Sequence, residues 1–348
     1  MLSISSDKID SLFELVGSKQ PLYLPVDNNS GKADFQKWEK GTKLSSALKT
    51  VRSAKDFFFP KTEHMVSYQM NGKEIKVEDP RKDVQDFVIF GVKACDARGF
   101  KAIDNVYLNM NPVDSYYKNR REHGTVICLA CNEPAKTCFC SNFGIDAAQN
   151  SSDGDVSCWL ADGKYYFKAN TDKGTAFIDS VKSVLSDADE KAVDECKKEI
   201  VEKIEKLPFA HLDLSKVGAK SQADMLKVFN SKIWEKIAEP CVGCGTCTYV
   251  CPTCMCFDVR DFDTGNGIRQ VRCWDSCMYH DFTQMAAANP RLTQKERSRQ
   301  RFMHKLMYYP MAHDGMSLCM GCGRCVESCP VNMNIVKVIK AISESDDI

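Results

Sequence analysis

The sequence predicts an α+β fold, with a mixed α/β domain in residues 1–220 and an all-α domain in residues 221–348. In the first part, strand-like and helix-like segments alternate; in the second, helical apolar stripes flank two cysteine-rich segments. The chain has 348 residues, of which 43% are hydrophobic, so it can bury a core in each of two domains.

The first domain begins with a helix and a strand. Apolar residues at helical spacing predict a helix over residues 9–15, and a strand follows at residues 22–26. Two more strand-like runs, 65–70 and 74–77, flank Asn71-Gly72, a dipeptide typical of a tight β-hairpin turn. A hairpin is therefore expected here.

Two buried strands are predicted at the continuous apolar runs 87–92 and 125–129. The first leads directly to Cys95 and the second to Cys131, so both cysteines are expected at the same edge of a mixed sheet. Helices are predicted at residues 175–185 and 188–206.

The second domain begins with a helix at Ser221 that Pro240 ends, because Ser221 can cap the helix and proline cannot continue it. A turn is predicted at residues 263–267. The pair Thr293 and Glu296 forms a capping box, which predicts the start of a helix that continues to about residue 309.

One cysteine pattern occurs twice near the end of the chain. Each copy has three cysteines at every third position and a fourth followed by proline: Cys241, Cys244, Cys247 and Cys251 in the first, and Cys319, Cys322, Cys325 and Cys329 in the second. In such pairs the first three thiolates hold one 4Fe-4S cluster and the fourth binds the other cluster. The predicted ligand sets are therefore Cys241, Cys244, Cys247 and Cys329 for one cluster, and Cys319, Cys322, Cys325 and Cys251 for the other.

Zinc is the alternative metal for these cysteines. Tetrahedral zinc needs only two pairs of thiolates, whereas each segment offers a third ligand at the same interval and then Cys-Pro, which favours iron–sulfur clusters. Because the two motifs lie far apart and helices flank them, this domain is predicted to be a helical ferredoxin-like dicluster domain.

The first domain has its own cysteines, Cys95, Cys131, Cys138 and Cys140, which could hold a third 4Fe-4S cluster on adjacent loops. Zinc or buried thiols are the alternatives. Four further cysteines lie between the two motifs and are not assigned as ligands: Cys254, Cys256, Cys273 and Cys277. They could be thiols beside the clusters, alternative ligands, a further site or simply packed core residues.

Composition and missing motifs restrict the function. Nineteen cysteines without a recognisable signal peptide indicate reduced, metal-bound thiols and a cytoplasmic protein. Equal numbers of basic and acidic residues, 47 each, give no field for nucleic acid, and the apolar runs are too short to span a membrane. No dinucleotide, phosphate-loop or hydrolase motif is present, so the chain is expected to be a non-catalytic electron relay.

One helix stands out by its positive charge. Its cations either form a solvated face, or raise the reduction potentials of nearby clusters or bind an acidic partner. They are Arg291, Lys295, Arg297, Arg299, Arg301, His304 and Lys305.

The segments CVGCGTCTYVCPTCMCFDVRDF, WDSCMYHDF and CMGCGRCVESCPV, with VKACDARGF and CLACNEPAKTCFC before them, resemble the iron–sulfur subunit family shared by anaerobic sulfite reductases and cytoplasmic sulfhydrogenases, where it is the beta subunit. The resemblance implies a flavin (FAD) and NAD(P)H-binding subunit or a ferredoxin on one side. On the other it implies a catalytic subunit with sirohaem or a nickel–iron site. Cys254, Cys256 and Cys277 match the family pattern, as do Cys95, Cys131, Cys138 and Cys140, whereas Cys128, Cys158, Cys196 and Cys273 fall outside it.

Three other functions stay open from the sequence alone. The first domain could bind flavin itself, which would make the chain a self-contained reductase, or the same relay could serve another multisubunit oxidoreductase. Alternatively, zinc could staple the thiols into an assembly scaffold.

Overall fold

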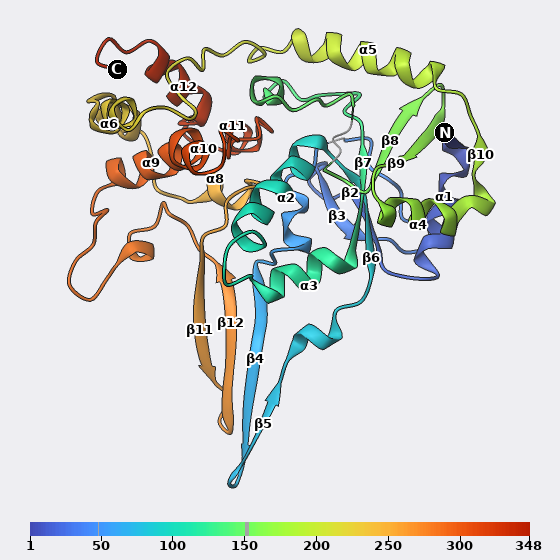
Figure 1. The fold of residues 1–348 in the computed structure, drawn as a ribbon, viewed down its shortest axis with the longest axis horizontal. Helices are drawn as coiled ribbons and strands as arrows, with labels where there is room; N and C mark the ends of the chain where they lie inside the picture. Colours follow the sequence, from blue (N-terminus) through green and yellow to red (C-terminus); the bar gives the residue numbers. More distant parts are fainter. Residues whose placement is uncertain (48, 150–152) are drawn as a thin grey trace.

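The computed structural model describes residues 1–47, 49–149 and 153–348, which form helices and two β-sheets, one of them within the helical body (Figure 1). The strand order of the first sheet is β10-β1-β9-β8-β7-β6-β2-β3, and that of the second is β11-β12-β4-β5. No helix among the described residues is both long and apolar enough to cross a membrane.

The first sheet is mixed, as expected for the N-terminal domain. Its centre is parallel, since β2, β6, β7 and β8 run in the same direction, and antiparallel strands lie toward both edges. All residues of β6 and β7 are buried, which accounts for their continuous apolar sequences. The strands are β1 (Leu2–Ser5), β2 (Leu22–Asp27), β3 (Ala33–Lys37), β6 (Phe87–Val92), β7 (Gly124–Leu129), β8 (Val156–Ala161), β9 (Lys164–Ala169) and β10 (Ser186–Asp187).

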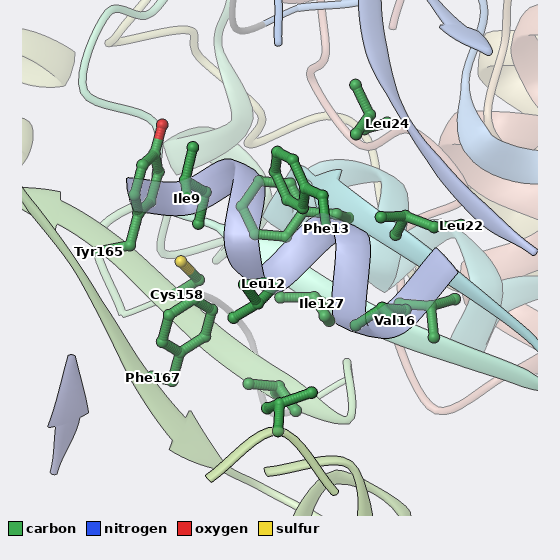
Figure 2. Packing of buried hydrophobic residues seen from close by; sticks show 14 of the residues in the cluster. Ile9, Leu12, Phe13, Val16, Leu22, Leu24, Ile127, Cys158, Tyr165 and Phe167 are labelled. Atoms are coloured by element: carbon green, nitrogen blue, oxygen red, sulfur yellow. The ribbon is translucent and has the colours of Figure 1, made fainter. Parts of the chain in front are cut away.

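Helices cover both faces of this sheet. On one face α1 (Ile9–Gly17) packs Leu12, Phe13 and Val16 against sheet residues including Ile127, as Figure 2 shows, and α4 (Asp172–Val181) joins the same core. On the other face lie α2 (Ala94–Tyr107) and α3 (Ser115–His123). Helix α5 (Lys191–Glu205) packs along β8. The helices and strands predicted for this part are thereby confirmed.

The second sheet forms a narrow arm that extends away from the rest of the molecule (Figure 1). It joins the hairpin of β4 (Thr62–Asn71) and β5 (Glu74–Glu78) to that of β11 (Phe257–Asp263) and β12 (Gly267–Trp274). The hairpin expected around Asn71-Gly72 is confirmed.

The prediction that residues 221–348 are all-α is wrong, because β11 and β12 lie within them. The turn at residues 263–267 closes the hairpin of β11 and β12. The other edge of β12 pairs with β4, which comes from a distant part of the sequence. A strand that depends on such a non-local partner is hard to recognise from local sequence.

Helices make up much of the remaining C-terminal part. The sequence predicts one helix over residues 222–239, but the structure has two, because the backbone of Ser231 is extended. The Ser231 hydroxyl accepts a hydrogen bond from the backbone N–H of Ile233, the first residue of the second helix. The capping box of Thr293 and Glu296 is present, and the helix it begins continues through a π-helical turn, His304–Tyr308. The helices are α6 (Gln222–Asn230), α7 (Ile233–Ala238), α8 (Thr246–Tyr249), α9 (Gln294–Met303), α10 (Tyr309–Ala312), α11 (Arg324–Glu327) and α12 (Ile335–Ser343).

Candidate iron–sulfur centres

The two cysteine motifs fold into the same local structure. In each, two glycines with positive φ turn the backbone and the second precedes a one-turn helix: Gly243 (+67°) and Gly245 (+72°) before α8, and Gly321 (+56°) and Gly323 (+72°) before α11. L-residues rarely adopt this backbone region, so glycine is required where the loop curls. Helices α8 and α11 contact each other, which places the two loops side by side.

The cysteines of the second motif surround Cys251 of the first. The thiols of Cys319 and Cys322 are each close enough to those of Cys251 and Cys325 for their charges to interact. Burial raises the pKa of Cys322 to about 12. The structure therefore brings together the four residues that the sequence predicts as one ligand set.

The first motif lies nearer the surface. Cys247 lies close to Cys241, and burial raises its pKa to about 11, whereas Cys244 is exposed. Gln294 donates a hydrogen bond to Cys241 Sγ over 3.4 Å. Cys329 packs in the same apolar cluster as Cys241, and its sulfur lies 3.2 Å from the backbone N–H donor of Met333.

Three buried cations lie beside these thiols. Lys55, Arg301 and Lys305 are 1%, 2% and 3% exposed, and within the described residues none of them has a carboxylate within 4.0 Å. Arg301 donates to the Cys247 carbonyl, while its Nε finds no partner. Although burial alone would lower the pKa of Lys305, the thiolates of Cys251 and Cys254 raise it above its usual value.

A buried charge is costly unless an opposite charge compensates it. Other buried arginines show the usual solution, since Arg272 pairs with Glu63 and Arg324 with Asp96. The negative groups that act on Arg301 and Lys305 are cysteine thiols, and Lys55 lies near Asp56 as well as near Cys254 and Cys251. The residues present therefore suit iron–sulfur clusters, whose thiolate ligands bring negative charge into this pocket.

The cysteines of the N-terminal part also converge. Cys95 follows β6 and Cys131 follows β7, and because these strands are parallel neighbours, both residues lie at the same sheet edge. Cys140 lies close to Cys138 and Cys131, and Cys95 lies close to Cys140. Burial raises the pKa of Cys131 to about 11 and that of Cys140 to about 12.

A buried lysine that the sequence analysis did not identify accompanies this group. Lys93 is 5% exposed and donates to the Leu129 carbonyl over 3.3 Å. Burial lowers its pKa, and the nearby thiols of Cys131 and Cys95 act in the opposite direction. The only local signal is a lysine directly after an all-buried strand, where a solvated side chain is not expected.

The N-terminal cysteine loop packs directly on the second motif. Phe139 donates its backbone N–H to the Gly321 carbonyl over 2.8 Å, and Cys138 Sγ lies 3.7 Å from the Cys322 carbonyl oxygen. A Cβ on Gly323 would come within 2.2 Å of the Thr137 carbonyl oxygen. The two cysteine groups are therefore immediate neighbours.

An ion pair joins the same two segments. Arg324, within the second motif, makes two hydrogen bonds to the carboxylate of Asp96, at 2.5 and 2.8 Å, and donates to the Thr50 carbonyl. Asp96 directly follows Cys95. Arg324 and Asp96 are 2% and 1% exposed, so this charge pair fixes the position of one cysteine group against the other.

The remaining cysteines fall into two classes. Cys128, Cys158, Cys196 and Cys273 lie on β7, β8, α5 and β12. In contrast, Cys254 forms a thiol hydrogen bond with Cys251, and Cys256 forms one with Cys277. In the part of the chain that the structure describes, no three His, Cys, Asp or Glu side chains are placed to hold a single metal ion.

The positively charged helix has no single solvated face. Arg301 and Lys305 point inward to the cysteines. Arg297 instead bonds to the Leu292 carbonyl, and Arg299 lies over the ring of Phe229 with its guanidinium carbon 3.7 Å from the centroid. Sequence charge patterning could not separate these roles.

Two comparisons with known proteins agree with this arrangement. Residues 240–333 match the family described as a 4Fe-4S dicluster domain. The chain is 33% identical over 347 residues to sulfhydrogenase 2 subunit beta of Pyrococcus furiosus, an alignment that covers 99% of this chain and 98% of that protein. No solved structure matches the chain significantly.

Proposed function

Because the chain belongs to the family of sulfhydrogenase beta subunits and carries a 4Fe-4S dicluster domain, it is an iron–sulfur electron-transfer subunit, and we propose that its three cysteine groups form a continuous relay. The family resemblance drawn from the cysteine-rich segments is confirmed by this similarity. When bound, each cluster supplies one-electron chemistry.

In this proposal the ligand sets are crossed. Cys319, Cys322, Cys325 and Cys251 hold one cluster, and Cys241, Cys244, Cys247 and Cys329 hold another. Support for the first set comes from the proximity of its four thiols. Support for the second comes from the contact between α8 and α11, which lays the two motifs side by side; Cys241 and Cys329 share an apolar cluster that also contains Cys319 and Cys325.

Cys95, Cys131, Cys138 and Cys140 hold a third cluster in the same proposal. The observation that carries the relay is the contact of this group with the second motif through Phe139, Gly321 and the buried pair of Arg324 and Asp96. Phe139, Asp96 and Arg324 are all buried, so this group and the second motif meet inside the protein.

The partners follow from the family and from electron count. Sulfhydrogenase subunit beta is by its name one subunit of a hydrogenase, so the chain is proposed to deliver electrons to, or take them from, a catalytic subunit with a nickel–iron site, or a sirohaem reductase. A nicotinamide gives two electrons as hydride, which requires a flavin-containing, NAD(P)H-binding subunit before single-electron sites. Ferredoxin is the alternative donor, and a cytoplasmic location is proposed because such thiols need reducing conditions.

The test is anaerobic purification followed by iron and acid-labile sulfide analysis, with electron paramagnetic resonance after dithionite reduction. The three clusters proposed here require at least about 12 irons per chain, and fewer than about eight would overturn even the two crossed sites. Flavin bound to the isolated chain would instead favour a self-contained reductase.

A further inference from the structure

The arm formed by the second sheet has one apolar face and one mostly polar face. In antiparallel strands, paired residues and alternate residues of one strand point to the same side. The pairing of the four strands therefore assigns six apolar side chains to a single face, here called the outer apolar face: Tyr68, Met70, Ile75, Val77, Val259 and Ile268. The opposite face carries Gln69, Asn71, Glu74, Lys76, Arg260 and Arg269.

The body of the protein covers only the root of the apolar side. At the root, Phe257 and Trp274 pack against Phe59, with ring centroids 6.2 and 6.1 Å away. Further out, the six side chains of the outer apolar face are all exposed, from 40% for Tyr68 to 63% for Ile75. A contiguous exposed apolar surface of this kind marks a binding site for another molecule.

The two edges of the arm are protected against pairing with a further strand. β5 and β11 are the edge strands. Charged side chains on edge strands oppose such pairing, and these strands carry Glu74, Lys76, Glu78, Asp258, Arg260, Asp261 and Asp263. The face of the arm, and not its edge, is therefore the surface that a partner can use.

Two carboxylates on the same face indicate the charge of the partner. Asp263 pairs with Ile268, and Asp261 lies two residues away on the same side of β11. Both are exposed, and in the part of the chain that the structure describes neither has a lysine or arginine within 4.0 Å. A complementary surface is apolar, with lysine or arginine side chains opposite β11.

A second copy of the chain does not supply these cations. Among the strand residues of the arm, the only lysine or arginine on this face is Arg272, which is buried and paired with Glu63 and Asp114. Two such faces packed together would leave the carboxylates against apolar side chains or against each other. The partner is therefore a different polypeptide.

The root of the arm adjoins the first cysteine motif. The Tyr249 ring centroid lies 6.2 Å from that of Trp274 and 6.3 Å from that of Tyr279. Tyr279 donates its hydroxyl to the carbonyl of Cys244, the exposed cysteine of the motif, over 3.3 Å. Helix α8 thus lies just beyond the root of the arm (Figure 1).

We propose that the outer apolar face is the docking surface of another subunit, a polypeptide with an apolar surface bordered by lysine and arginine, which the arm holds on the side of the first motif. The identity of the partner as a subunit of the same electron-transfer complex rests on the proposed function. The docking itself uses no cluster ligand.

The first experiment places the photo-crosslinking residue p-benzoylphenylalanine at Met70 or, as the control, at Gln69, which points to the opposite face. The full-length chain is co-expressed with its partner subunits, isolated through a tag on this chain, irradiated and analysed by peptide mass spectrometry. Met70 should cross-link to a different subunit, at an apolar segment next to lysine or arginine, and Gln69 should not. Cross-links to a second copy or to this chain alone, no cross-link from Met70, or equal cross-linking from both positions would overturn the proposal.

Variants measure the contribution of the face to binding. Met70→Ser with Ile75→Ser changes one cross-strand pair of the outer apolar face, and Gln69→Ser with Lys76→Ser changes the adjacent pair on the opposite face. The first should weaken association with the partner subunit at least about tenfold, and the second should leave it unchanged. Equal association of the two double variants would refute the docking surface. Should a double variant fail to fold, the cross-linking decides.

Charge and iron content separate this proposal from the relay. Asp261→Asn with Asp263→Asn should weaken the association and reduce its dependence on salt concentration. Full iron content with unchanged association of the Met70 and Ile75 variant would overturn the docking surface and leave the relay standing. An iron-free chain that still cross-links from Met70 to another subunit would overturn the relay and support the docking surface.

Discussion

Lys305 gives the sharpest test of the buried-charge argument. Replacing it with methionine keeps a long, flexible side chain at a position that is 3% exposed, but removes a positive charge beside Cys251. Reduction adds negative charge to a cluster, and a nearby cation favours that state. The reduction potential of the cluster proposed at Cys251, Cys319, Cys322 and Cys325 should therefore fall.

The size of the shift follows from two contacts. Lys305 Nζ lies 2.9 Å from Thr253 Oγ1, which lies 3.4 Å from Cys251 Sγ. The charge is thus within roughly 6 Å of the sulfur, where a unit charge is worth about 2.7 kcal/mol at an effective dielectric constant near 20. For one electron this corresponds to at most about 120 mV.

The assay is an anaerobic redox titration followed by electron paramagnetic resonance. Lys295→Met is the matched control, because Lys295 belongs to the same helix but is exposed and pairs with Glu235 near the surface, so its charge is screened. A fall of several tens of millivolts in one cluster of Lys305→Met, with the control unchanged, is the expected result. Equal potentials in the two variants would refute the electrostatic role of Lys305.

Three further predictions concern ligation, pH and backbone geometry. Cys251→Ser should impair the cluster of the second motif and Cys329→Ser that of the first; EPR that shows damage within each residue's own motif would contradict crossed ligation. Burial is the main reason that the pKa of His304 is lowered from 6.5 to about 4. The folded protein therefore holds this imidazole neutral, and its contribution to the free energy of unfolding is complete above pH 6.5 and is lost as the pH falls toward 4. His304→Gln should reduce the loss of stability in denaturant titrations between pH 6.5 and about 5 by about 2 kcal/mol, and identical slopes for variant and wild type would exclude this origin. Gly323→Ala places a Cβ at a φ of +72° and against the Thr137 backbone, so it should lower the unfolding free energy by at least about 2 kcal/mol. Gly144→Ala is the control, because φ there is +65° but the surrounding space is open, and its cost should be clearly smaller. Equal costs would mean that the backbone near Gly323 shifts to accept the methyl group.

Local chemistry explains which features were predictable. The strands at residues 87–92 and 125–129 could be recognised because buried parallel strands are apolar along their whole length, and Asn71-Gly72 sits in a hairpin because its turn is encoded within a few residues. The capping box of Thr293 and Glu296 is equally local. The β11–β12 hairpin was missed because β12 pairs on its other side with β4, about two hundred residues earlier in the chain.

The sequence by itself determined the metal chemistry and the family, because three cysteines at every third position and a following Cys-Pro constrain a cluster within a single loop. Only the tertiary structure decided what surrounds these loops. Lys55 and Lys93 come from segments far from the second motif, yet both are buried beside thiols, and Arg324 reaches Asp96 across the same interface. Burial and charge compensation depend on which segments pack together, and no local pattern specifies that.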